Sequence, residues 1–239
     1  MKDYIDFQVH DKLNPKLWDN ETLKSDVRRK LIKIANAFHK FLNVKAKLRD
    51  VIMTGSSSNY NYSSKFSDID LHLLYDFDDV LSEEEEEPIE TEADLVKEYM
   101  MAKKTIWNDK FDITINGVEV ELYSQDIDEP HEANGQFSIV KNNWVKKPEK
   151  IDVELDEKAA ESKAKELMDL IDHTLKGDPS DSTIQKLKDK IKRLRQIGLD
   201  KEDGEYSVEN LAFKVLRRSG YIEKLWDSEV ESQQKDFSL

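Results

Sequence analysis

Residues 51–74 constrain the fold more than any other part of the chain, because they predict two β-strands joined by a polar segment. A short apolar run leads into a turn at Gly55-Ser56. From 68 to 74, apolar and polar residues then alternate as they do in a strand that is buried on one face. Because alternate side chains of a strand share a face, Asp68 and Asp70 should project from the same side, roughly 7 Å apart.

Two carboxylates at this separation repel each other unless a cation lies between them. A solvated edge strand that carries two acids is the alternative interpretation. The apolar neighbours Ile69, Leu71 and Leu73 favour a strand inside a sheet. We therefore interpret Asp68 and Asp70 as ligands of a metal ion.

The order of these features resembles the signature of the DNA polymerase β superfamily of nucleotidyltransferases. Gly-Ser is followed by eleven residues and then by Asp-x-Asp between apolar residues. The resemblance covers about residues 22–126. It implies an α/β (α+β) fold with a mixed sheet flanked by helices, in which the Gly-Ser turn binds a triphosphate and the two Asp bind two Mg²⁺ ions. It also implies that Gly55, Ser56 and Ser57 contact the nucleotide, with Ser57, Ser58 and Asn59 forming a polar rim beside it. Tyr60 and Tyr62 either stack on a base or pack the turn.

A third carboxylate should lie on a neighbouring strand, according to the resemblance. Asn116-Gly117 between alternating residues predicts a β-hairpin, since both central residues of a type I′ turn need a positive φ. Its second arm, 118–123, places Glu119 and Glu121 on one face. Members of the family often have an acid followed by two apolar residues at this place, so the resemblance favours Glu121 as the ligand. Glu119 remains an alternative ligand or a base.

The implied reaction transfers a nucleoside monophosphate from an NTP to a hydroxyl group and releases pyrophosphate. Two Mg²⁺ ions about 4 Å apart would activate the acceptor hydroxyl and stabilise the leaving group. The acceptor stays open between an RNA 3′ end, a protein and a small molecule. The alternatives are a non-catalytic, antitoxin-like relative that binds a nucleotide or a partner, and a synthase of cyclic or linear oligonucleotides.

Helical periodicity predicts a helix over 21–43 with Asn20 as its N-cap. It resumes after 90, and beyond about 151 it dominates, with Ser182 and Ser207 starting two of the helices. We therefore expect a nucleotidyltransferase core at 1–150 and a helical domain at 151–239. The basic residues Lys214 and Arg217 either form a solvated face or contact the triphosphate, and the basic segment 186–195 could contact phosphate or RNA.

Composition excludes several classes of protein. The net charge of −14, from 37 basic and 51 acidic residues, argues against an extended grip on duplex DNA. No apolar run approaches the length of a membrane span, and the polar N-terminus predicts a cytoplasmic protein. Without cysteine there is no disulfide or thiolate zinc site. The run Glu83–Glu87 predicts a solvated loop, because adjacent like charges repel.

Overall fold

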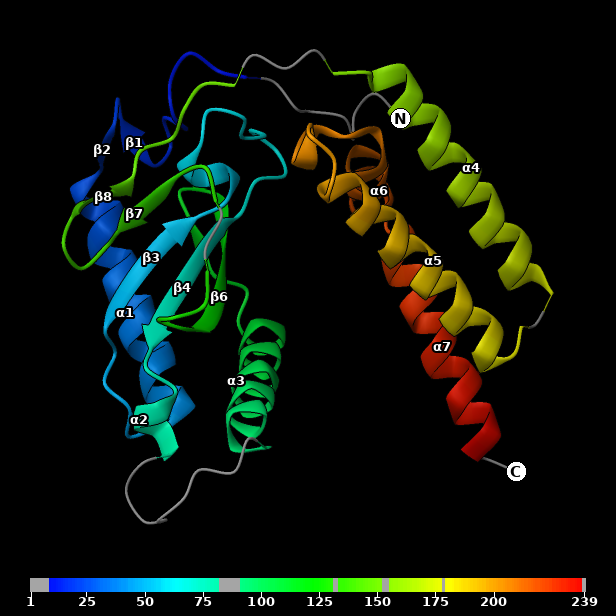
Figure 1. Cartoon of the computed structure of the whole chain (residues 1–239), viewed down its shortest axis with the longest axis horizontal. Helices are drawn as coiled ribbons and strands as arrows, with labels where there is room; N and C mark the ends of the chain where they lie inside the picture. The colour runs from blue at the N-terminus through cyan, green and yellow to red at the C-terminus, as the bar shows by residue number, and fades with distance from the viewer. Residues whose placement is uncertain (1–8, 82–90, 131–132, 152–154, 178, 238–239) are drawn as a thin grey trace. The chain divides into compact units, whose positions relative to one another are not determined.

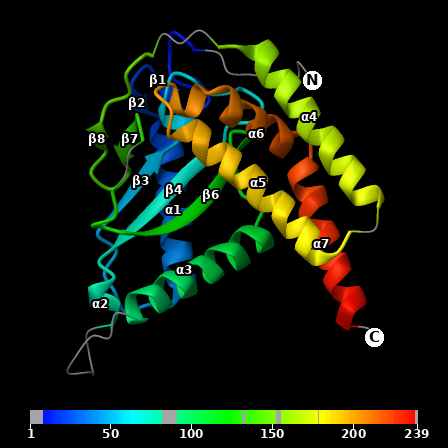
Figure 2. The same cartoon turned by 45° about the vertical axis from the view of Figure 1, so that its right-hand side comes forward.

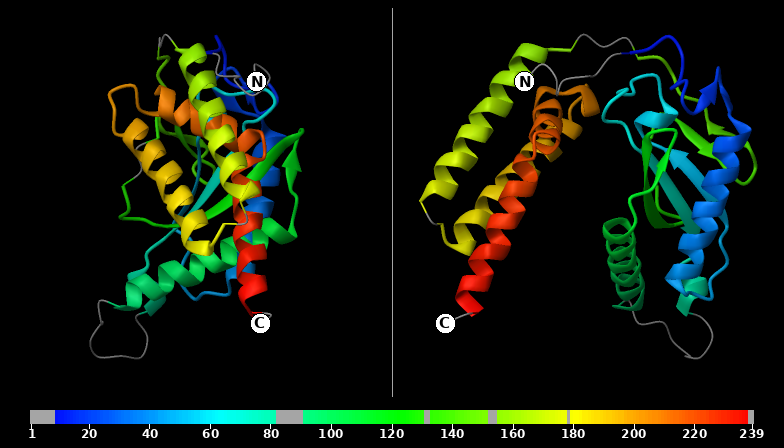
Figure 3. Two further views of the ribbon diagram at one scale, coloured as in Figure 1. Left: turned by 90° about the vertical axis from the view of Figure 1, so that its right-hand side faces the viewer. Right: turned by 180° about the vertical axis from the view of Figure 1, so that it is seen from behind.

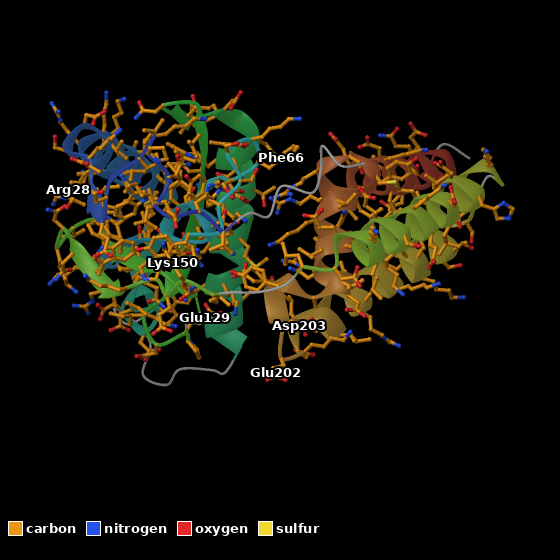
Figure 4. All side chains as sticks on the ribbon, turned by 90° about the horizontal axis from the view of Figure 1, so that it is seen from above. Arg28, Phe66, Glu129, Lys150, Glu202 and Asp203 are labelled. Carbon is orange, nitrogen blue, oxygen red and sulfur yellow. The ribbon has the colours of Figure 1, made fainter. Side chains whose placement is uncertain are left out.

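The computed structural model describes residues 9–81, 91–130, 133–151, 155–177 and 179–237. The chain forms two compact units, one of Phe7–Ile151 and one formed mainly by Asp152–Leu239. Figure 1 shows their helices and strands, and Figure 4 shows the side chains that fill each unit. The glutamate run Glu83–Glu87 lies outside the described residues.

The described part of the first unit contains a six-stranded sheet with the order β5-β6-β4-β3-β7-β8. Strand β4 is parallel to β6, and the other neighbours are antiparallel. The sheet is therefore mixed, which confirms the predicted mixed α/β class. The strands are β3 Asp50–Thr54, β4 Ile69–Tyr75, β5 Thr114–Ile115, β6 Val118–Asp126, β7 Gln136–Ser138 and β8 Asn143–Lys146.

Helix α1, Ser25–Leu42, covers one face of this sheet, and in Figures 2 and 3 it runs along the strands. Its buried residues are apolar and recur every three or four positions, so one stripe faces the strands. The strand residues that face this helix are the buried ones, which alternate with more exposed residues along β4 and β6. The shared core includes Val27, Leu31, Phe38, Met53, Leu71 and Leu122. Arg28, labelled in Figure 4, donates from α1 to the carbonyl oxygens of Ile139 and Val140 at 2.8 and 2.9 Å.

The predicted N-cap of this helix is wrong. Asn20 has a φ of 52° and lies in the turn between β1, Trp18–Asp19, and β2, Thr22–Leu23, and α1 begins only at Ser25. The reason is that Trp18 and Leu23 are both buried, which folds this segment into a small hairpin. Asparagine tolerates the left-handed conformation that such a turn needs.

Helix α3, Thr91–Lys110, follows the short helix α2, Asp78–Leu81, and connects β4 to β6. Such a helical crossover is what a parallel pair of strands requires. Trp107 of α3 packs in the same core, with its ring 5.4 Å from that of Phe38. The side-chain amide of Asn108 makes two contacts with the backbone of Leu122 on β6. Its Nδ2 atom donates to the carbonyl oxygen and its Oδ1 atom accepts from the N–H, each at 3.4 Å.

The Asn116-Gly117 hairpin forms as predicted. Ile115 pairs with Val118, so the loop has two residues, whose φ angles are 53° and 75°. The loop joins the short edge strand β5 to the long strand β6.

The second unit consists of α4 Glu157–Lys176, α5 Asp181–Leu199, a 3₁₀ turn at Gly204–Tyr206, α6 Val208–Arg218 and α7 Tyr221–Phe237. Ser207 caps α6 as predicted, because its side chain accepts a hydrogen bond from the backbone N–H of Asn210. The N-cap of α5 is Ser180 and not the predicted Ser182. The core of the unit includes Ile171, Ile184, Ile191, Leu216 and Leu225. Within the described ranges, no helix has the length and apolar character needed to cross a membrane.

Candidate functional site: three carboxylates beside a Gly-Ser turn

The parallel register of β4 and β6 places Asp70 directly opposite Glu121. Both residues project from the face opposite to α1, because the buried residues Ile69, Leu71, Val120 and Leu122 alternate with them. Asp68 immediately precedes β4. The structure brings one carboxylate oxygen of each acid within 4.8 Å of the others, and all three side chains are partly exposed.

Gly55 lies against this cluster in a conformation that only glycine adopts readily. Its φ is 70° and its ψ is −163°, and a Cβ atom at this position would lie 1.8 Å from Oδ2 of Asp70. Thr54, the preceding residue, pairs with Asp70 across the β3–β4 ladder. The turn therefore brings its backbone against a carboxylate, and any side chain at position 55 would displace that carboxylate.

The serines after Gly55 hold the segment that carries the acids. Ser56 shares a hydrogen bond of 2.7 Å with the hydroxyl of Ser67, which lies just before Asp68. The hydroxyl of Ser57 donates to the main-chain oxygen of Asp68 at 2.5 Å. The indole of Trp18 in turn donates to the main-chain oxygen of Ser57 at 2.8 Å. This chain of contacts fixes Asp68 to the core of the unit.

The side chains of Ser57, Ser58 and Asn59 do not form the predicted polar rim, whereas contact of Gly55, Ser56 and Ser57 with a nucleotide stays a prediction. Ser57, Ser58 and Asn59 are buried, because the polypeptide turns inward as a 3₁₀ helix at Ser56–Ser58 before it crosses to β4. The two tyrosines that follow also pack. The ring of Tyr62 stacks on His10 with the centroids 4.0 Å apart, and the hydroxyl of Tyr60 donates to Glu21 at 3.3 Å.

Two further residues at the carboxylate cluster are absent from the sequence prediction. The Nζ atom of Lys104 on α3 lies 3.3 Å from Oε1 of Glu121 and 3.8 Å from the ring centroid of Tyr123. Burial raises the pKa of the Tyr123 hydroxyl, and the negative charges of Asp70, Glu121 and Asp68 raise it further. The sequence around Lys104 does not predict its contact with Glu121, because this contact depends on α3 lying along β6.

Beyond Tyr123 the same face of the sheet stays polar. The His72 ring stacks on Tyr123 with the centroids 4.7 Å apart, and its Nδ1 atom lies 2.8 Å from Oε1 of Gln125. These contacts hold the Tyr123 ring beside Glu121. Two side chains thus contact the third carboxylate, Lys104 from α3 and Tyr123 from its own strand.

The other predicted site residues are Glu119, Lys214 and Arg217. Glu119 shares the face of Glu121 but is exposed, pairs with Thr114, and is not among the three clustered acids. Lys214 and Arg217 belong to α6 of the second unit. There, burial lowers the pKa of Lys214, and its Nζ atom lies 3.7 Å from Oε2 of Glu205. That Lys214 and Arg217 contact a triphosphate stays a prediction.

The donor set of this cluster fits a hard divalent cation. All three donors are carboxylate oxygens, which Mg²⁺ and Mn²⁺ prefer, and their partial exposure leaves room for water or phosphate as further ligands. The ammonium group of Lys104 beside Glu121 indicates that the cluster already attracts positive charge. Together with Gly55, the cluster can bind a metal ion and bring a phosphate close to backbone N–H groups.

A scan against models of protein families gave no match, and searches for similar curated proteins and for similar solved structures gave none either.

Proposed function

We propose that the chain is a Mg²⁺-dependent nucleotidyltransferase of the DNA polymerase β superfamily type, acting in the cytoplasm. The observation that carries the proposal is the convergence of Asp68, Asp70 and Glu121 within 4.8 Å, beside a Gly-Ser turn that packs against Asp70. Neither the acid cluster nor the Gly-Ser turn would be specific by itself, since exposed acids often cluster without a metal ion. Their combination supports transfer of a nucleoside monophosphate from an NTP to a hydroxyl group.

Each residue of the candidate site would have a separate role in the proposed reaction. Asp68 and Asp70 would hold two ions and Glu121 one of them, and bound Mg²⁺ would supply Lewis-acid stabilisation of charge on the phosphates. Gly55 leaves space for the triphosphate because it has no side chain. Ser57 and Trp18 act on Asp68 through the backbone and are positioning residues. Lys104 pairs with Glu121 and would compete with a bound ion for that carboxylate.

The acceptor would be an RNA 3′ end, a protein hydroxyl or a small molecule. To test the proposal, the full chain is incubated with each of the four α-labelled NTPs, Mg²⁺ and a cell extract, and the extract is then fractionated. We expect the label to appear in one of these acceptor classes and pyrophosphate to be released. Substitution of a ligand carboxylate should lower the rate by roughly 100-fold or more, because charge stabilisation at the phosphates is lost.

The variant series uses a matched control from the same strand. Glu121→Gln and Asp70→Asn should abolish transfer, whereas Glu119→Gln, the same chemical change two positions along β6, should leave it nearly intact. Equal losses in Glu119→Gln and Glu121→Gln would contradict the assignment of the third ligand. Tight NTP binding without pyrophosphate release would instead support the non-catalytic nucleotide-binding alternative. If the labelled product were a ring or a chain built from NTP alone, the chain would be an oligonucleotide synthase.

A further inference from the structure

The second unit contains a hollow of about 550 Å³ between α5, α6 and α7, which pack against each other in Figures 2 and 3. This volume lies within the range of small-molecule sites in proteins, roughly 300–1,000 Å³. Most of the lining is apolar, and the largest apolar side chains are Phe213 and Trp226, of which Trp226 is 45% exposed. A flat apolar group would therefore find two aromatic rings in the hollow.

The remaining lining is basic. Lys188, Lys192 and Arg195 occur at helical spacing on α5 and line the hollow together with Gln196, and no described acidic residue lines it. This positive charge stands out in a chain whose net charge is −14. It lies within the basic segment 186–195 that is evident in the sequence.

The cations lie over the aromatic rings. Lys188 is buried, forms an ion pair with Glu229, and places its Nζ atom 3.3 Å from the ring centroid of Trp226. Lys192 lies 5.6 Å from the same centroid, and the guanidinium carbon of Arg195 lies 4.6 Å from that of Phe213. Glu229 offsets the charge of Lys188, whereas Lys192 is exposed and forms no ion pair within the part of the chain that the structure describes.

We propose that this hollow binds a nucleotide unit, with the base on Trp226 or Phe213 and the phosphate at Lys192 and Arg195. A nucleotide combines the two properties that the lining selects, a flat aromatic group and an anion attached to it. Bases stack on aromatic side chains whatever their identity, and basic groups along the same groove hold the phosphates. The amide of Gln196 can bond to a base edge.

This inference deepens the proposed function, because a nucleotide bound by residues other than the carboxylate cluster would belong to the acceptor. Only the assignment of this nucleotide to the acceptor rests on the proposed function; the binding of a nucleotide unit at the hollow does not. The nucleotide unit can come from a free nucleotide or from the end of an RNA strand, and the two sources share the same chemistry at the hollow.

The test follows tryptophan fluorescence of the full chain in EDTA, which removes divalent ions and so disfavours binding at the carboxylates. Adenosine monophosphate and a short single-stranded oligoribonucleotide serve as separate probes. We expect at least one of them to quench the emission, and the quenching to be lost in Trp226→Phe. Stronger quenching by the oligoribonucleotide assigns the hollow to a strand end, and equal quenching assigns it to a free nucleotide.

Charge reversal then separates a local site from general attraction. Lys192→Glu should weaken binding by about tenfold, because it places a negative charge where the phosphate binds. Lys186→Glu makes the same change at another exposed position of α5 that does not line the hollow, and it should have little effect. Equal effects of the two variants, or quenching by neither probe, would overturn the inference. Asp70→Asn should bind both probes normally, so failure of the metal site and failure of this hollow give different results.

Discussion

Substitution of Gly55 by alanine tests most directly whether the turn and the carboxylates form one site. The added Cβ would lie 1.8 Å from Oδ2 of Asp70, where ordinary contacts begin at 3.4 Å, so the carboxylate must move away. The backbone conformation, with a φ of 70° and a ψ of −163°, adds a cost of roughly 1–3 kcal/mol for a residue with a side chain. We expect Gly55→Ala to destabilise the first unit modestly and to weaken metal binding strongly.

Gly117→Ala provides the matched control. Gly117 has a φ of 75°, but a Cβ atom added there would meet no other atom within 4 Å, so the control carries backbone strain without a collision. The strain should cost about 1–2 kcal/mol. Both variants should therefore lower the urea midpoint by about 1 M, which is a cost of about 2 kcal/mol divided by a slope of about 2 kcal/mol per M. Only Gly55→Ala should also weaken Mn²⁺ binding, by about tenfold or more, which corresponds to about 1.4 kcal/mol.

The measurements are Mn²⁺ titration by electron paramagnetic resonance and urea unfolding followed by tryptophan fluorescence. A Trp226→Phe background confines the fluorescence to Trp18, Trp107 and Trp144, which all belong to the first unit. Wild-type Mn²⁺ affinity in Gly55→Ala would refute the reasoning, because Asp70 could not then be a ligand in the observed position. Equal losses of affinity in both glycine variants would refute it too, since strain alone would account for them.

Two further predictions concern ion pairs. Lys104→Met should raise Mn²⁺ affinity by up to roughly fivefold, because Glu121 would no longer be paired with an ammonium group. A partly exposed ion pair of this kind is worth at most about 1 kcal/mol, which sets the limit on the effect. Weaker Mn²⁺ binding by Lys104→Met in the same titration would contradict this prediction. In the second unit, the ammonium of Lys224, 2.5 Å from Asp172, lowers the pKa of that carboxyl below its ordinary value of 3.8. A depressed carboxyl pKa stabilises the fold above the ordinary value and ceases to do so as the pH falls. Calorimetry should therefore find the wild-type protein slightly more stable than Asp172→Asn at neutral pH. Well below pH 3.8 the two proteins should be equally stable, and a stability difference that persists in acid would contradict this prediction.

Local patterns in the sequence predict much of this structure. The alternation at 68–74 and 118–123 and the Asn116-Gly117 turn depend on neighbouring residues only, and all three occur in the fold. The helices of the second unit follow from their apolar spacing in the same way. The predicted start of α1 fails because the burial of Trp18 and Leu23, a tertiary effect, overrides the capping preference of Asn20.

Within the candidate site, the predictable part is again the local one. Asp68, Asp70 and Glu121 can be selected from strand alternation and motif order, and the structure groups these three acids. The roles of Lys104 and Trp18 cannot be selected in this way, because each reaches its partner from a separate element. The inward direction of Ser57 likewise depends on the 3₁₀ turn and on the main-chain oxygen of Asp68.

The pairing of β4 with β6 has a consequence for how the protein acquires its site. Asp70 and Glu121 are about 50 positions apart, and the chain between them contains α3 and the hairpin strand β5. Non-local pairing of parallel strands forms slowly, because the entropy of closing the intervening loop is lost before the contacts stabilise it. The hairpin at Asn116-Gly117 and the helices can form earlier from local contacts. During refolding, Mn²⁺ binding should therefore appear only when β4 and β6 pair, later than most of the helical signal.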